Sequence, residues 1–212
     1  FINYSGGAIG ADSYWESIGK EFGLGKQVNY KPEILKQLSN EQISEVESAY
    51  IKAVKDLGRK PLQYNWINPQ KEDYAGGLVR RDYLQAKAAD AIFAISDIIL
   101  PNEKGKEVKG IRYSNKLDKP IVDGGTGYAV QMGINLNKLI YVFHQGTNKD
   151  NKTEIGWYKW ENNSFLKVNT PILTKKFAGI GTREINKKGI QAIKDVYSNQ
   201  DSETKCGNIE PI

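Results

Sequence analysis

The 212-residue sequence has almost none of the side chains that form disulfides or bind transition metals: one cysteine, Cys206, and one histidine, His144. A lone cysteine cannot form a disulfide within the chain, and so few cysteines are typical of a reducing compartment. A single histidine excludes a zinc site of the cysteine/histidine type, and a Ser-His-Asp triad would have to use His144. We therefore expect a cytoplasmic protein with no bound metal and no cofactor.

Long hydrophobic runs and dense clusters of positive charge are missing as well. No apolar run approaches the roughly 20 residues of a membrane-spanning helix, so we expect no association with a membrane. The net charge is +5, but lysine and arginine are spread along the chain in short groups such as Arg80-Arg81 and Lys187-Lys188. Nucleic-acid-binding surfaces usually cluster these residues, whereas diffuse positive charge favours a small anionic ligand. We expect such a ligand and no nucleic acid as partner.

Apolar strands alternate with amphipathic helices along the chain. The continuous apolar run at 91–95, between Asp90 and Ser96, is typical of a strand buried on both faces of a parallel sheet. The pattern predicts the α/β class, with a Rossmann-like parallel sheet, helices on both faces, and a small β-hairpin near 156–166 around Asn162-Asn163. The expected strands are 1–4, 26–30, 91–95, 139–143 and 176–180, and the expected helices are 10–22, 40–57, 78–89, 128–136 and 189–197.

The length suits one domain. We expect residues 1–197 to form a single nucleotide-binding domain with a helical insertion at about 33–60. The polar residues 198–212 are expected to be a flexible tail.

Three turns between an expected strand and an expected helix combine glycine with a small hydroxyl residue: Ser5-Gly6-Gly7, Gly124-Gly125-Thr126-Gly127 and Gly181-Thr182-Arg183. Glycine allows close approach of a ligand to the backbone, and the following helix offers unpaired N–H groups and a partial positive charge. Threonine hydroxyls and the arginine fork would add donors for phosphate. None of the turns is a Walker loop or a complete G-x-G-x-x-G fingerprint, which argues against ordinary nicotinamide redox chemistry. The turns therefore predict a phosphate-bearing ligand outside the carboxyl ends of the strands.

Four segments, in their order along the chain, resemble the SLOG superfamily of Rossmann-like domains: 5–12, 78–82, 90–95 and 123–127. This superfamily includes lonely-guy phosphoribohydrolases, DNA-processing proteins of the Smf type and ligand-sensing domains of bacterial immunity. The chain is most similar to small phage and bacterial members that also carry a Gly-Ile-Gly-Ser/Thr-Arg-Glu turn. In those members this turn comes first, whereas here it lies at 179–184, so the chain looks circularly permuted. The resemblance implies that the 176–181 strand lies beside the N-terminal strand, within one chain or by exchange between subunits. We also expect the protein to form a homo-oligomer.

The resemblance also bears on catalysis. Lonely-guy enzymes carry a catalytic glutamate after their glycine turn, and Gln131 stands at that position here, while Arg81 matches the family arginine. Because an amide cannot act as a base, binding is expected to survive where that chemistry is lost. If the protein is an enzyme, Arg81, Asp12 and Glu184 are the candidate catalytic residues. The turns and the resemblance together predict a ligand site of Ser5, Gly6, Gly7, Gly10, Asp12, Arg81, Gly124, Gly125, Thr126, Gly127, Gln131, Gly181, Thr182 and Arg183.

Three functions follow from the resemblance. The first is binding and sequestration of a cyclic nucleotide or ADP-ribose-type signal, as a phage sponge against nucleotide-based immunity in the host cytoplasm would require. The second is hydrolysis of an N-glycosidic bond, as in a nucleotide phosphoribohydrolase. The third and weakest is binding of single-stranded DNA, as in a DNA-processing relative.

Overall fold

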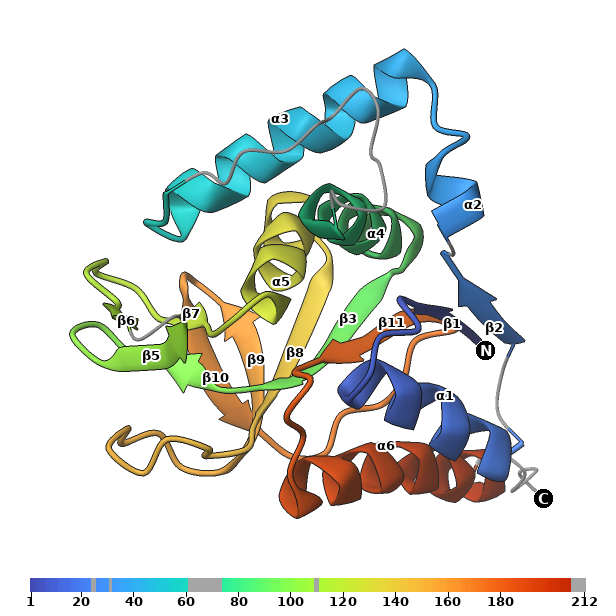
Figure 1. Cartoon of the computed structure of the whole chain (residues 1–212). Coiled ribbons are helices and arrows are strands. Elements are labelled where there is room, and N and C mark those ends of the chain that lie inside the picture. The colour runs from blue at the N-terminus through green and yellow to red at the C-terminus, as the bar shows by residue number, and fades with distance from the viewer. Residues whose placement is uncertain (24–25, 31, 61–73, 109–110, 207–212) are drawn as a thin grey trace.

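The computed structural model describes the chain except for residues 24–25, 31, 61–73, 109–110 and 207–212. A seven-stranded sheet runs through the centre in the order β10-β9-β8-β3-β11-β1-β2 (Figure 1). The strands from β8 to β2 in this order are parallel, and β9 and β10 are antiparallel at one edge. The predicted α/β class and mainly parallel sheet are confirmed. The strand bounds are β1 Ile2–Ser5, β2 Lys26–Asn29, β3 Ala91–Ser96, β8 Leu139–His144, β9 Gly156–Glu161, β10 Ser164–Val168 and β11 Lys176–Gly181.

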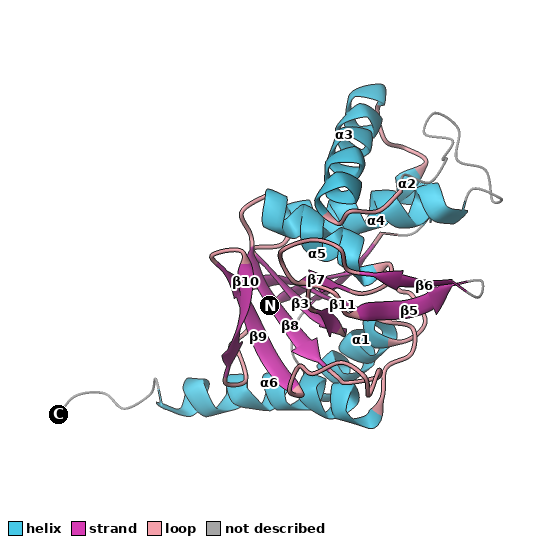
Figure 2. Ribbon diagram, turned by 90° about the vertical axis from the view of Figure 1, so that its left-hand side faces the viewer, coloured by secondary structure: helices cyan, strands magenta, loops and turns pink. Residues whose placement is uncertain are grey.

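Helices cover both faces of the sheet (Figures 1 and 2). The helices α3, α4 and α5 share one hydrophobic core with the sheet, and α1 and α6 share the other. Among the described residues, no helix is long and apolar enough to cross a membrane. The helix bounds are α1 Ala11–Glu21, α2 Pro32–Leu35, α3 Asn40–Asp56, α4 Tyr74–Ala88, α5 Thr126–Asn135 and α6 Lys187–Cys206.

The burial of strand β3 explains why residues 91–95 are all apolar. Phe93 and Ile95 point into the core beneath α1 and α6, whereas Ile92 and Ala94 point into the core beneath α4 and α5. All four are at most 1% exposed. A strand with helices on both sides has no solvated face, so the run 91–95 has no polar alternation.

The two ends of the chain meet in the sheet. Strand β1 pairs in parallel with β11, with Ile2 opposite Lys176 and Asn3 opposite Phe177. The buried Asn3 side chain accepts a hydrogen bond from the Gly179 N–H at 2.9 Å. The 176–181 strand therefore docks beside the N-terminal strand of the same chain, the first of the two arrangements expected.

The predicted hairpin is confirmed, and it extends the central sheet. Strand β9 pairs with β8, and β10 pairs with β9. Asn162 and Asn163 both have positive φ, 51° and 57°, as a two-residue type I′ turn requires.

Two helices are longer than the sequence predicts. Helix α4 begins at Tyr74 instead of 78, and α6 runs to Cys206, past the point where a flexible tail was expected to begin. Helix α6 continues because Val196, Tyr197 and Gln200 are buried beyond its first turns, which makes continuation of the helix favourable. Residues 207–212 of the predicted tail lie outside the described residues.

Two short antiparallel pairs connect β3 to α5. Strand β4 (Ile98–Ile99) pairs with β7 (Ile121–Val122), and β5 (Lys104–Val108) pairs with β6 (Ile111–Ser114). The apolar residues before the 124–127 turn thus lie outside the central sheet.

The segment predicted as an insertion at about 33–60 contains α2 and α3, and α3 adds Val46 and Tyr50 to the core over α4 and α5.

Candidate functional site

A pocket of about 550 Å³ lies at the carboxyl ends of β3 and β11. These neighbouring parallel strands lead to helices on opposite faces: β11 is followed by α6, and the chain after β3 continues to α5. Such a divergence opens a crevice at the sheet edge, where ligands of α/β proteins usually bind. The wall is formed by Ala8, Asp12, Leu78, Val79, Arg81, Asp82, Gln85, Ser96, Asp97, Gly105, Lys106, Glu107, Asp123, Gly124, Gly125, Thr126, Tyr128, Ala129, Gln145, Thr147, Asn148, Lys149, Ile180, Gly181, Thr182, Arg183 and Glu184.

The structure brings together many of the residues that the sequence singles out, although they come from distant parts of the chain. Two of the three glycine turns, one at 124–126 and the other at 181–183, contribute residues to the wall of this one pocket. The predicted residues in the wall are Asp12, Arg81, Gly124, Gly125, Thr126, Gly181, Thr182, Arg183 and the catalytic candidate Glu184. The predicted ligand contacts that lie outside the wall are Ser5, Gly6, Gly7, Gly10, Gly127 and Gln131.

The first glycine turn shapes the pocket from behind. The buried Ser5 side chain accepts a hydrogen bond from the Gly7 N–H at 3.1 Å, which closes the turn on itself. A Cβ atom added at Gly6 would lie 2.5 Å from Asp12 Oδ2 and 2.9 Å from Arg81 Nε. Gly6 is therefore needed because the two pocket side chains rest on its backbone, which explains its place in the motif without a direct ligand contact.

Gly10 brings the two ends of the chain together at the pocket. Its φ is +102°, and an added Cβ would lie 2.5 Å from the Thr182 carbonyl oxygen. The next amide, Ala11 N–H, donates to that same carbonyl at 3.0 Å. The start of α1 thereby fixes the 181–183 turn against the N-terminal part of the chain.

Gln131 is directed away from the pocket. Its side chain is 4% exposed and donates through Nε2 to Asn135 Oδ1, and Asn135 in turn donates to Asp56 on α3. A glutamate at this position of α5 would be buried beside Asn135, outside the pocket wall. The amide at 131 thus carries no weight against catalysis in this pocket.

One end of the pocket is lined by carboxyl groups from α1 and α4. Burial raises the pKa of Asp12 to about 7, with the Arg81 charge and the backbone N–H groups of Gly181 and Ala8 acting in the opposite direction. Burial also raises the pKa of Asp82 to about 8, again against the charge of Arg81. Near neutral pH these acids are therefore largely or partly uncharged, and Arg81 is their common neighbour.

The second glycine turn is held by an arginine that the sequence analysis misses. Arg59, which follows α3, donates through Nη1 to the Gly124 carbonyl at 2.8 Å and through Nη2 to the Val122 carbonyl at 3.1 Å. Its guanidinium carbon lies 4.8 Å from the centre of the Tyr128 ring. Arg59 belongs to no motif, and only the packing of α3 on α5 brings it to this turn.

Asp123 fastens this turn to the β5–β6 hairpin. Its Oδ1 accepts from the Gly124 N–H at 2.9 Å, and its Oδ2 accepts from the Lys106 N–H at 2.7 Å. Burial raises the pKa of Asp123, and the two backbone donors lower it. The hairpin is thereby fixed at the mouth of the pocket.

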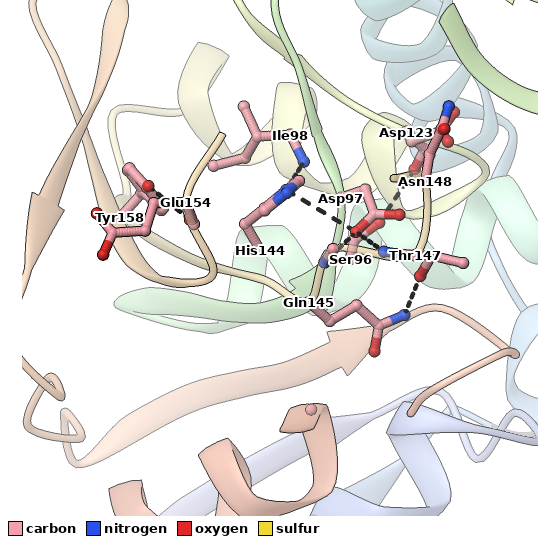
Figure 3. A network of polar contacts seen from close by, with 12 residues as sticks. Ser96, Asp97, Ile98, Asp123, His144, Gln145, Thr147, Asn148, Glu154 and Tyr158 are labelled. Atoms are coloured by element: carbon pink, nitrogen blue, oxygen red, sulfur yellow. Dashed lines mark hydrogen bonds and ion pairs between the residues drawn. The ribbon is translucent and has the colours of Figure 1, made fainter. Parts of the chain in front are cut away.

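A polar network after β3 and β8 contributes to the pocket wall (Figure 3). Asp97 Oδ1 accepts from the backbone N–H groups of Gly146 and Thr147, at 2.9 and 3.2 Å. Gln145 donates to Thr147 Oγ1 and to the Glu184 carbonyl, and its Oε1 accepts from the Asn186 N–H. Asp97 and Gln145 thus join the loop after β8 to the loop after β11.

His144 belongs to this network but does not line the pocket. The ring is 1% exposed, and its Nδ1 accepts a hydrogen bond from the Ile98 N–H at 2.8 Å. Burial lowers the pKa of His144, while the nearby Asp97 carboxylate acts in the opposite direction. The accepted hydrogen bond requires the neutral ring, so His144 anchors β4 and is not placed as a catalytic base.

Several exposed charged side chains lie at the mouth of the pocket. Lys106 Nζ lies 2.7 Å from Glu184 Oε1, and Arg183 and Lys149 also line the wall.

Among the described residues, no group of three or more histidine, cysteine, aspartate and glutamate side chains is arranged to hold a metal ion.

Comparison with protein-family models, with curated proteins and with solved structures finds no match for this chain. The similarity to the SLOG superfamily therefore rests on its motifs and on their order in the sequence.

Proposed function

We propose that this pocket binds a small nucleotide-type ligand that carries ribose and phosphate. The observation that carries the proposal is that two glycine turns line the same pocket, Gly124-Gly125-Thr126 at the start of α5 and Gly181-Thr182-Arg183 before α6. The first turn presents the N-terminus of a helix of 10 residues, and the second presents a hydroxyl and a guanidinium. Together they offer the donors and the charge that phosphate needs.

The pocket can accept an anion although several carboxyl groups line it. The raised pKa values of Asp12 and Asp82, about 7 and about 8, leave these buried acids largely or partly protonated at neutral pH. The Asp97 carboxylate already accepts two backbone N–H groups. The negative charge of the pocket wall is therefore smaller than its number of acidic residues suggests. It opposes the attraction of an anionic ligand to the positive side chains less strongly.

The volume also agrees with such a ligand. A pocket of about 550 Å³ lies within the range of roughly 300–1,000 Å³ that is common for small-molecule sites. Tyr128 in the wall offers an aromatic surface for a base. Tight binding without turnover would suit sequestration of a cyclic nucleotide or ADP-ribose-type signal, the role that the SLOG resemblance favours.

The test has two parts: identifying the bound ligand, and identifying the residues that bind it. Mass spectrometry of small molecules released by denaturation comes first, followed by calorimetric titration with ADP-ribose and cyclic nucleotides. We expect Arg183→Gln to weaken binding about tenfold or more, because a charge-assisted hydrogen bond is lost. Lys188→Gln is the matched control, since it removes one exposed positive charge outside the pocket. Equal affinity of the two variants, or no binding by the unmodified protein, would contradict the proposal.

A second candidate, hydrolysis of an N-glycosidic bond, is favoured by the acids at one end of the pocket. In this reaction a carboxylate accepts a proton from the attacking water, and a carboxylic acid donates a proton to the departing base. Asp12 and Asp82 have pKa values near those that such a pair needs at neutral pH. Chromatography after incubation with nucleoside monophosphates and ADP-ribose separates the two functions. Released base that disappears with Asp12→Asn supports hydrolysis, whereas unchanged ligand supports sequestration.

A further inference from the structure

The mouth of the pocket contains an ion pair between two elements that each carry part of the wall. Lys106 on the β5–β6 hairpin and Glu184 after β11 both line the pocket, and Lys106 Nζ lies 2.7 Å from Glu184 Oε1. We propose that Lys106 is a binding residue for the anionic group of the ligand, and that Glu184 competes with this group for the Lys106 ammonium and so limits affinity. This inference rests on the proposed binding of an anionic ligand.

Lys106 is placed beside the glycine turn by its own backbone. Its N–H donates to Asp123 Oδ2 at 2.7 Å, and Asp123 Oδ1 accepts from the Gly124 N–H at 2.9 Å. At Gly105, an added Cβ would lie 2.6 Å from Asp123 Oδ1, so the hairpin sits directly on this carboxylate. One side chain therefore joins Lys106 to the turn that is proposed to hold phosphate, and the ammonium can serve the same anion.

The backbone of Glu184 is held by hydrogen bonds, whereas its side chain is exposed and contacts Lys106. Its N–H donates to Thr182 Oγ1 at 3.2 Å, and its carbonyl accepts from Gln145 Nε2 at 3.1 Å. The side chain itself is 61% exposed, and that of Lys106 is 44% exposed. The carboxylate can therefore leave the ammonium by rotation of its side chain, without movement of the loop.

The ion pair is weak enough for an incoming phosphate group to replace the Glu184 carboxylate at the Lys106 ammonium. Exposed ion pairs contribute little to stability, because solvent screens them and side-chain entropy opposes them. A phosphate group forms stronger charge-assisted contacts with an ammonium than a single exposed carboxylate does. Competition of this size should reduce ligand affinity about two- to fivefold, which calorimetry resolves.

The experiment measures the dissociation constants of inorganic pyrophosphate and ADP-ribose by calorimetry for four variants and the unmodified protein. Glu184→Gln should bind about two- to fivefold more tightly, and Lys106→Gln should bind more weakly. In Lys106→Gln/Glu184→Gln the gain from the second substitution should vanish. A gain that persists in the double variant would show that Glu184 acts only through long-range charge, and this would overturn the proposal.

The matched control is Glu154→Gln. Glu154 forms an ion pair with Lys167 at the same 2.7 Å, with side chains 75% and 45% exposed, and neither residue lines the pocket. Its substitution changes the net charge equally and should leave both dissociation constants unchanged. If the unmodified protein binds the probes and Glu184→Gln binds them no better, the competition is refuted while the proposed function stands. If neither protein binds either probe, both fail.

Discussion

The indole N–H of Trp15 in α1 donates to the backbone carbonyl of Ile180 in β11 at 3.2 Å. Both residues are buried, although they lie near opposite ends of the sequence. The Trp15 ring also contacts Phe177 and Tyr197, whose hydroxyl donates to the Trp15 carbonyl at 2.8 Å. One side chain of the N-terminal helix thus holds the C-terminal strand that carries the 181–183 turn.

Trp15→Phe should destabilise the protein by about 1–3 kcal/mol, because the substitution leaves the buried Ile180 carbonyl without its donor. Chemical unfolding measures the change in the free energy of unfolding. Trp160→Phe is the control: Trp160 is partly exposed on β9, next to the edge strand β10, and its ring packs on Phe165. Equal effects of the two substitutions would show that the hydrogen bond to β11 has no special weight.

Gly6→Ala should weaken ligand binding and destabilise the fold. The added methyl group would lie within 3 Å of Asp12 and Arg81, so both side chains must shift from the positions that they hold in the pocket wall. Gly77→Ala is expected to have the opposite effect on stability. At Gly77, inside α4, a Cβ meets no described atom within 4 Å, and alanine in a helix is favoured over glycine by about 0.5–1 kcal/mol. Thermal unfolding with and without ligand distinguishes the two variants.

The acids in the pocket predict a pH dependence of stability above the range in which ordinary carboxyl groups titrate. The pKa values of Asp12 and Asp82 are raised from 3.8 to about 7 and about 8, so the folded protein retains protons that the unfolded chain has lost. Stability should therefore fall as the pH rises from 6.5 to 8. Asp82→Asn should remove most of this slope and Asp12→Asn a smaller part, as measured by urea unfolding at several pH values. A slope unchanged in both variants would refute the assignment.

His144 predicts a pH dependence of the opposite sign at lower pH. Its pKa is lowered from 6.5 in the folded protein, so the unfolded chain takes up the proton first. Its contribution to stability is therefore lost as the pH falls below about 6.5, when protonation breaks the hydrogen bond from the Ile98 N–H. The sequence has no other histidine, so His144→Gln removes this titration entirely. Subtracting the pH profile of the variant from that of the unmodified protein should show the loss below 6.5.

Most of the architecture could be predicted from local patterns. The run at 91–95 identified a strand buried on both faces, and the alternation of apolar segments indicated the parallel sheet. Asn162-Asn163 marked the hairpin because asparagine tolerates positive φ. The error at α6 arose because residues beyond 197 are polar in sequence, although Gln200 is buried in the fold.

The candidate site was predicted in part. The turns at 124–126 and 181–183 lie in the pocket wall, because glycine-rich turns after strands gather at one edge of a parallel sheet. Arg59, Asp97, Gln145 and Lys106 were missed, because each reaches the site through contacts between elements far apart in the chain. Sequence position also could not show that Gln131 is buried beside Asn135 outside the pocket, since α5 packs against α3, α4 and β3.

By itself the sequence determined the kind of fold and where the backbone turns sharply, since periodic burial and glycine conformation are local properties. The tertiary structure alone decided which of these turns form the pocket. It placed Gly6 against Asp12 and Arg81, and it brought Gly181-Thr182-Arg183 and Gly124-Gly125-Thr126 into the wall of the same pocket. The reason is physical: the pairing of β1 with β11 and the helices on opposite faces after β3 and β11 depend on contacts between distant segments, which no local pattern encodes.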